Sequence, residues 1–391
     1  MRNCLLPNLQ CKLREAIFSE PGKVFLIALS SRIVVFIAVI AGAFFFGPSQ
    51  SPSGIPIVSL FSHWDAGWYT KIALFGYPAG TNPLSGNWAF FPFYPFLMRL
   101  FGAPLFAVMS PADAVTLSGF AISNLLFFAN IILFYKVTKI IFNSSRFSLI
   151  STVFFAFWPG ALFYSTVYSE SLFMVFTLGA FYLLEKGHSG KSAALGFLAA
   201  LTRSNGFLVL IPFVYHGLQT HKYRTAIYQA IVIAMPYLLF SVYGYFSTGL
   251  FPIREIVYNH IWGTSRLALT DIVTNQTGYI ALFSAETVLL VIPFLWFILS
   301  EKISISDFVR GTKVERKDLK YWAFSIYILL MLALYADPKN IQRYALPILP
   351  LYWVFALVYD RNKMAGSVLL IASTVILIIG SILFATGGLF L

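Results

Sequence analysis

Long runs of apolar residues, separated by short charged loops, dominate this sequence from one end to the other. Hydrophobic residues make up 59% of the chain and charged residues only 11%, whereas a soluble domain carries about 25% charged residues. Because so few charges cannot cover a water-exposed surface, most of the surface must face lipid. The sequence therefore predicts an all-α polytopic membrane protein.

The apolar runs set the expected number of membrane spans, since a spanning helix needs about 20 apolar residues. The candidate spans are residues 24–46, 114–135, 149–166, 168–184, 192–202 with 206–218, 226–247, 278–299, 321–336, 344–359 and 365–388. Thr202-Arg203-Ser204-Asn205-Gly206 interrupts 192–218, so this stretch is either two short helices or one continuous helix. We expect about 9–11 spans in a single domain covering residues 1–391.

Positive charge is distributed unequally between the two sets of loops. If 192–218 is two spans, one set holds 19 of the 27 lysines and arginines, the opposite set holds 7, and Arg32 lies within the first span. Such an excess predicts a cytoplasmic N-terminus. The net charge of +12 comes from these lysines and arginines, which set the membrane topology and contact anionic lipid headgroups. No nucleic-acid partner is therefore expected.

This topology places the loop 47–113 outside the cytoplasm and the charged loop 300–320 inside it. Within the outer loop, Ser59 to Tyr77 and Trp88 to Phe106 are rich in aromatic and aliphatic residues. They predict amphipathic helices that lie along the membrane surface rather than cross it. Pro92 and Pro95, in an aromatic run, predict a structural turn.

Asp65 stands in the sharpest local motif, Phe61-Ser62-His63-Trp64-Asp65-Ala66-Gly67-Trp68-Tyr69, just after the first span. A carboxylate at the membrane–water boundary can act as a general base on a hydroxyl delivered by a lipid. The structural alternative is that Asp65 caps a helix over 66–75, because Asp is a favoured N-cap residue. The two roles are compatible.

Two further motifs place polar residues between apolar spans. Glu170 follows Tyr168-Ser169, and an acidic residue at membrane depth is a functional-site hypothesis. Arg203 and Asn205 lie in Thr202-Arg203-Ser204-Asn205-Gly206. A guanidinium binds phosphate oxygens well, so Arg203 is either a phosphate clamp or the structural partner of Glu170.

A short polar loop near the C-terminus, Asp337-Pro338-Lys339-Asn340-Ile341-Gln342-Arg343-Tyr344, supplies Gln342 and Arg343 as further candidates for phosphate binding. No phosphate-binding P-loop or dinucleotide-binding glycine pattern occurs in the sequence, and the five histidines are scattered. We therefore expect no metal site, no cofactor and no nucleotide-driven pump.

These motifs together resemble the GPI mannosyltransferase 2 family, also called phosphatidylinositol glycan class V. The resemblance covers residues 30–210, and the C-terminal half contributes only its span pattern and Gln342-Arg343-Tyr344. It rests on His63-Trp64-Asp65, Gly76-Tyr77, Ala89-Phe90-Phe91-Pro92 with Pro95, Tyr168-Ser169-Glu170 and Thr202-Arg203-Ser204-Asn205-Gly206.

The resemblance implies a GT-C membrane glycosyltransferase that takes mannose from a polyprenyl-phosphate donor on the luminal or extracytoplasmic face. In eukaryotic members the acceptor is the growing GPI glycolipid, which receives its second mannose through an α-1,6 bond. Because His63 and Gly67-Trp68 depart from the eukaryotic pattern, the chain looks more like prokaryotic relatives. The membrane is then the plasma membrane, or the endoplasmic reticulum for a eukaryotic source.

The resemblance also implies roles for the motif residues. Asp65 would deprotonate the acceptor hydroxyl, and Arg203, with Arg343, would hold the donor phosphate. The remaining candidates would shape the substrate pocket; they are His63, Trp64, Glu170, Asn205 and Gln342. Rival interpretations are a flippase for a lipid-linked sugar, a non-catalytic scaffold subunit and a GT-C transferase for another sugar or acceptor. Whether a small membrane subunit accompanies the chain stays open.

Overall fold

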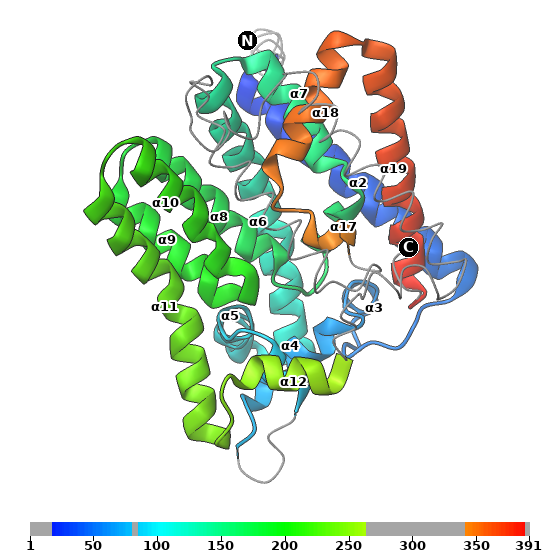
Figure 1. The fold of residues 1–391 in the computed structure, drawn as a ribbon. Coiled ribbons are helices and arrows are strands. Elements are labelled where there is room, and N and C mark those ends of the chain that lie inside the picture. The colour runs from blue at the N-terminus through cyan, green and yellow to red at the C-terminus, as the bar shows by residue number, and fades with distance from the viewer. Residues whose placement is uncertain (1–17, 80–84, 263–340, 388–391) are drawn as a thin grey trace, which may run out of the picture.

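The computed structural model describes residues 18–79, 85–262 and 341–387 (Figure 1). Within these ranges the regular structure is helical and no strand occurs. The elements are α2 (Glu20–Phe46), α3 (Pro56–Ser59), α4 (Asp65–Phe75), η1 (Gly86–Ala89), α5 (Phe93–Gly102), η2 (Ala103–Ala107), α6 (Pro111–Phe142), α7 (Ser145–Ala156), η3 (Pro159–Tyr164), α8 (Glu170–Glu185), α9 (Ser189–Thr202), η4 (Ser204–Val209), α10 (Leu210–Gln219), α11 (Tyr223–Thr248), α12 (Ile253–Trp262), α17 (Ile341–Tyr344), α18 (Leu349–Arg361) and α19 (Lys363–Ala385).

Four of the described helices, α2, α6, α11 and α19, are long and apolar enough to cross a membrane. They coincide with the predicted spans 24–46, 114–135, 226–247 and 365–388, and they confirm an all-α polytopic membrane protein. Two other predicted spans, 278–299 and 321–336, and the loop 300–320 lie outside the described residues.

The first and last of these helices, α2 and α19, pack side by side (Figure 1). Their first residues line one groove, and their last turns meet where Gly42 contacts Ile382, so the two helices run parallel. A Cβ on Gly42 would lie 2.7 Å from the carbonyl oxygen of Ile382. Glycine therefore allows the two backbones to approach closely, as small residues do between membrane helices.

Two predicted spans are not continuous helices. The run 149–166 breaks after α7, because Trp158 precedes Pro159 and a residue before proline avoids the helical region. Trp158 is extended, with φ −60° and ψ 142°. The run 344–359 is helical only from Leu349, after Pro347 and before Pro350. In both places a proline stands at the start of the next helix, where its missing backbone N–H costs no hydrogen bond.

The stretch 192–218 is also divided, which decides between the two interpretations that its sequence allowed. α9 ends at Thr202, Arg203 is extended with φ −145° and ψ 148°, and the chain resumes as η4 and α10. Gly206 packs against the last turn of α9, where a Cβ would lie 2.3 Å from the carbonyl oxygen of Ala199. The chain thus breaks at Arg203, and the side chain of Arg203 is presented at a helix end.

The loop 47–113 contains the short helices that its aromatic content predicted. α4 and α5 pack against α6, with Tyr69 and Tyr94 buried. The outward side of α5 is apolar, since Phe96, Leu100 and Phe101 are each more than half exposed. Pro92 occupies the N-cap position of α5, so the prediction of a structural turn at this proline is confirmed.

A connector without α-helix, residues 158–169, contains the 3-10 helix η3, joins α7 to α8 and is buried throughout. Backbone without a helix is tolerated at membrane depth only where protein satisfies its polar groups. Side chains of α6 do this: Asn124 donates to the Ser165 carbonyl at 3.2 Å, and Ser123 donates to the Tyr168 carbonyl at 3.1 Å. The connector therefore delivers Glu170, the first residue of α8, to a defined place in the interior.

Candidate active site

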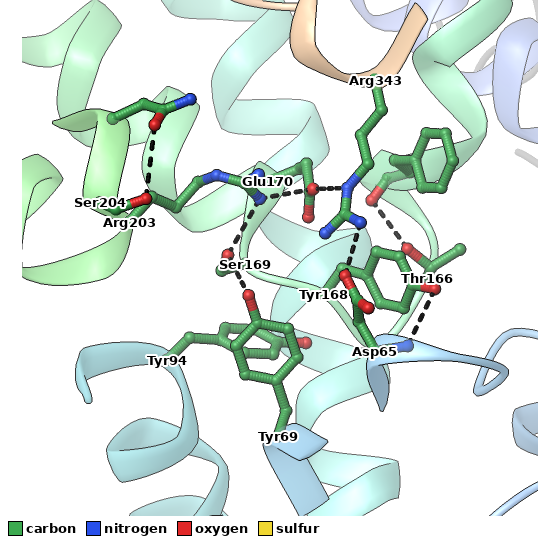
Figure 2. A network of polar contacts seen from close by, with 12 residues as sticks. Asp65, Tyr69, Tyr94, Thr166, Tyr168, Ser169, Glu170, Arg203, Ser204 and Arg343 are labelled. Carbon is green, nitrogen blue, oxygen red and sulfur yellow. Dashed lines mark hydrogen bonds and ion pairs between the residues drawn. The ribbon is translucent and has the colours of Figure 1, made fainter. Parts of the chain in front are cut away.

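Asp65 is the first residue of α4 and lies close to residues from the far end of the chain (Figure 2). Its Oδ2 accepts a hydrogen bond from Nη1 of Arg343 at 2.5 Å. The expectation that Asp65 itself is the N-cap residue is wrong, because Trp64 holds that position and the Asp65 carboxylate turns to a guanidinium. A negative charge in the first helical turn still interacts favourably with the helix dipole.

Glu170 accepts hydrogen bonds from two arginines through the same oxygen, Oε1. Nη1 of Arg203 lies 2.5 Å from it, and Nε of Arg343 also donates to it. The structural pairing of Arg203 with Glu170 is therefore confirmed. The phosphate-clamp role of Arg203 stays a prediction, and the pairing does not exclude it, since a guanidinium carries five N–H donors.

Arg343 joins the two carboxylates, so that Asp65, Arg343, Glu170 and Arg203 form one chain of ion pairs, the ionic cluster (Figure 2). Its guanidinium lies over the ring of Tyr168, with 4.4 Å between Cζ and the ring centroid. Arg343 lies in α17, whereas the other three residues open α4, open α8 and follow α9. The cluster thus connects four segments that are distant in sequence.

The ionic cluster is electrically balanced and unequally exposed. It contains two carboxylates and two guanidinium groups, which suits an interior where an unpaired charge is costly. The Glu170 side chain is 3% exposed and that of Arg343 7%, whereas those of Arg203 and Asp65 are 14% and 23% exposed. Asp65 therefore has the most exposed side chain of the cluster.

Hydroxyl groups around the cluster hold its backbone in place. Ser169 Oγ accepts from Arg203 at 3.2 Å and shares a hydrogen bond with the Tyr69 hydroxyl at 2.7 Å. The Tyr168 hydroxyl donates to the His63 carbonyl at 3.0 Å and accepts from the Asp65 backbone N–H at 3.3 Å. Tyr168 therefore fixes the turn from which Asp65 projects.

Four of the predicted site residues have side chains outside the ionic cluster. The His63 ring contacts the Gln50 carbonyl through Nδ1 at 3.0 Å and packs against Phe384, and its burial lowers the pKa of the imidazole. Trp64 is 53% exposed. Asn205 accepts from the neighbouring Ser204 hydroxyl at 3.3 Å. Gln342 is buried, and its backbone carbonyl accepts a hydrogen bond from Trp158 Nε1 at 3.0 Å.

Sequence reasoning missed Tyr69, whose hydroxyl hydrogen-bonds to Ser169 beside the ionic cluster. Tyr69 lies four residues after Asp65 in α4, and residues at that spacing share one face of a helix. The spacing of four residues in a predicted helix could therefore have placed Tyr69 on the same face as Asp65. The sequence indicates Arg343 as a candidate through its polar loop, but not that it meets Asp65 and Glu170, because those contacts depend on where α17 packs.

The described side chains can be searched for groups of metal-ligating residues. In residues 18–79, 85–262 and 341–387 no group of three or more His, Cys, Asp or Glu side chains is close enough together to hold an ion. The expectation that the activity needs no divalent metal stays a prediction.

Glu170→Gln is expected to destabilise the fold strongly, because the substitution removes the only acidic partner that Arg203 has among the described ion pairs and leaves two cations together. Breaking one side of a buried ion pair costs roughly 3–5 kcal/mol. Thermal unfolding of the purified protein in detergent measures this loss. Glu20→Gln is the matched control, because the Glu20–Lys139 pair is about 40% exposed on both sides. Equal unfolding midpoints for the two variants would contradict the prediction.

Comparison with known families places these residues in a recognised sequence region. A family model described as Mannosyltransferase (PIG-V) matches residues 56–250. That region contains Asp65, Glu170 and Arg203, whereas Arg343 lies beyond it. Three members of the ionic cluster are thus inside the matched segment, and the fourth reaches them only through the fold.

Individual relatives are similar over the same part of the chain. Identity is 27% over 224 residues with GPI alpha-1,6-mannosyltransferase 2 of Homo sapiens, a match covering 51% of this chain and 44% of the relative. The corresponding protein of Mus musculus is 32% identical over 181 residues, covering 44% and 35%. GPI mannosyltransferase 2 of Schizosaccharomyces pombe is 27% identical over 202 residues, covering 51% and 40%. The match spans less than half the length of each relative.

Proposed function

Because this chain belongs to the mannosyltransferase (PIG-V) family, we propose that it is a membrane glycosyltransferase that moves mannose from a polyprenyl-phosphate donor to a lipid-linked glycan acceptor. The transfer would take place on the extracytoplasmic face, where the distribution of Lys and Arg puts Asp65. The observation that carries the proposal is the ionic cluster, in which two carboxylates and two guanidinium groups come together at helix ends of a membrane protein.

Asp65 would act as the general base. Its carboxylate would accept the proton of the acceptor hydroxyl while the hydroxyl oxygen attacks the anomeric carbon of mannose. The bond between that carbon and the phosphate oxygen breaks in the same step, and the polyprenyl phosphate leaves with the bonding electrons. The support for this role is the place of Asp65, at the start of α4 and with the most exposed side chain of the cluster.

Arg343 and Arg203 would hold the donor phosphate. Negative charge grows on the leaving phosphate in the transition state, and fixed cations stabilise it most where little water is present. Both guanidinium groups are held by Glu170, so their positions are set before a substrate arrives. A planar guanidinium with several donors can contact a phosphate while it retains a carboxylate partner.

The test is transfer of labelled mannose by the purified full chain in lipid vesicles. Labelled polyprenyl-phosphate-mannose is supplied with a mannosyl-glycolipid acceptor, and labelled glycolipid is measured with and without a metal chelator. The proposal predicts a labelled product in both samples. A flippase would instead move the intact donor between leaflets without forming product, and a label that stays on the donor would overturn the proposal. Product loss with the chelator would overturn only the expectation about metal.

A further inference from the structure

We infer that Arg32, in the first membrane helix, is a positioning residue for the reaction, and that it acts by holding the connector 158–169, which leads into Glu170 and contacts the backbone at Asp65. The inference rests on the proposed function for its catalytic readout. Arg32 lies in the middle of α2 and its side chain is buried, with 5% exposed. A buried arginine in a membrane span is rare and expensive, which makes it a candidate for a specific role.

The partners of Arg32 are neutral. Nη1 donates to Ser165 Oγ at 2.6 Å, and Nη2 donates to the Ala161 carbonyl at 3.0 Å and to Ser31 Oγ at 3.0 Å. The guanidinium also lies over the ring of Phe127, with 3.7 Å between Cζ and the centroid. Among the described residues no acidic side chain pairs with it. Its hydrogen bonds therefore hold the connector, and none of them neutralises an acidic side chain among the described residues.

The connector transmits this anchoring to both carboxylates of the cluster. Ser165, which Arg32 contacts, lies five residues before Glu170. Between them, the Val167 N–H donates to the Phe61 carbonyl at 2.9 Å, and Tyr168 binds the backbone at His63 and Asp65. The same short segment thus sets the place of Glu170 and of the turn before Asp65.

The number of contacts explains why arginine stands at this position. The fork of a guanidinium reaches a backbone carbonyl and two hydroxyl oxygens together, whereas a lysine ammonium is a single point of attachment. Polar backbone without a helix needs such partners at membrane depth. Arg32 therefore does for Ala161 and Ser165 what Asn124 and Ser123 of α6 do for carbonyls further along the connector.

The experiment compares Arg32→Met and Arg32→Lys with wild type in the full chain, using mannosyl transfer per folded protein and hydrogen exchange of the connector. We expect Arg32→Met to lower kcat at least about tenfold, because small displacements of catalytic groups cost that much or more. The KM for the donor should change less than about threefold, because Arg32 contacts none of the cluster side chains. Arg32→Lys should fall between Arg32→Met and wild type.

Hydrogen exchange gives a readout that does not depend on activity. Backbone amides of residues 158–169 should exchange faster in Arg32→Met, while those of α19 keep their rates. Gln229→Met is the matched control. Gln229 is buried in α11 and donates to the Ser189 carbonyl of α9 at 3.0 Å, so its hydrogen bond lies outside the connector. The control should leave kcat and the exchange of the connector unchanged.

The outcomes separate the inference from the proposed function. If wild type transfers mannose and Arg32→Met matches it per folded protein, the positioning role is overturned. The same holds if exchange of the connector is unchanged. If wild type forms no product, the proposed function fails, and faster exchange in Arg32→Met still supports the anchoring of the connector.

Discussion

Asp65→Asn should abolish mannosyl transfer while the protein still folds. An amide cannot take the proton of the acceptor hydroxyl, and loss of a general base typically lowers a rate by about 10²–10⁴-fold. The fold should survive because Asp65 is the most exposed member of the ionic cluster and the amide oxygen can still accept from Arg343. The measurement is the initial rate of glycolipid labelling at equal amounts of folded protein.

The control for this prediction is Asp113→Asn. Asp113 is a second carboxylate at the start of a helix, α6, where it accepts from the Ser53 hydroxyl and the Gly54 N–H. It has no contact with the ionic cluster among the described hydrogen bonds, so its substitution should leave transfer within a few-fold of wild type. Undiminished transfer by Asp65→Asn would remove the base role.

Arg343→Lys is expected to lose almost as much activity as Asp65→Asn. Arg343 binds Asp65 through Nη1 and Glu170 through Nε, and a single ammonium group cannot keep both contacts in that geometry. Losing one group that stabilises transition-state charge typically costs about 10²–10³-fold in kcat. The prediction is checked by the same labelling assay together with the thermal unfolding midpoint.

Arg203→Lys provides a comparison within the same cluster. Arg203 contacts both Glu170 and Ser169 through one nitrogen, Nη1, so an ammonium group can replace more of its interactions. Its loss of activity should therefore be smaller than that of Arg343→Lys. Arg146→Lys, a surface change at the Asp360 pair, should have no effect. Equal losses for the two cluster variants would contradict the central place of Arg343.

The structure also changes how the motifs around Asp65 are interpreted. His63 and Trp64 precede Asp65 directly, yet His63 packs toward α19 and Trp64 points to the surface of the described structure. Tyr168, from the connector, lies closer to the charged groups of the ionic cluster, since it contacts the Asp65 backbone and the Arg343 guanidinium. Neighbourhood in sequence is therefore a poor guide to which side chains share the site.

Composition and local pattern were enough to determine several features. The scarcity of charge decides in favour of a membrane protein, because lipid-facing helices need no charged surface. The prolines and the aromatic runs predict short helices in the loop 47–113, and the polar interruptions between apolar runs indicate Asp65, Glu170 and Arg203. These features depend on neighbouring residues and on the surrounding solvent, so one stretch of sequence is sufficient to predict them.

Only the tertiary structure decided which charges meet. The chain has 27 lysines and arginines, and the need of Glu170 for a cation does not indicate which of them supplies it. Arg343 lies 278 residues after Asp65, and it reaches the carboxylates only because α17 packs beside the connector. Electrostatic attraction has no sequence pattern of its own, so the packing of distant helices determines the pairs.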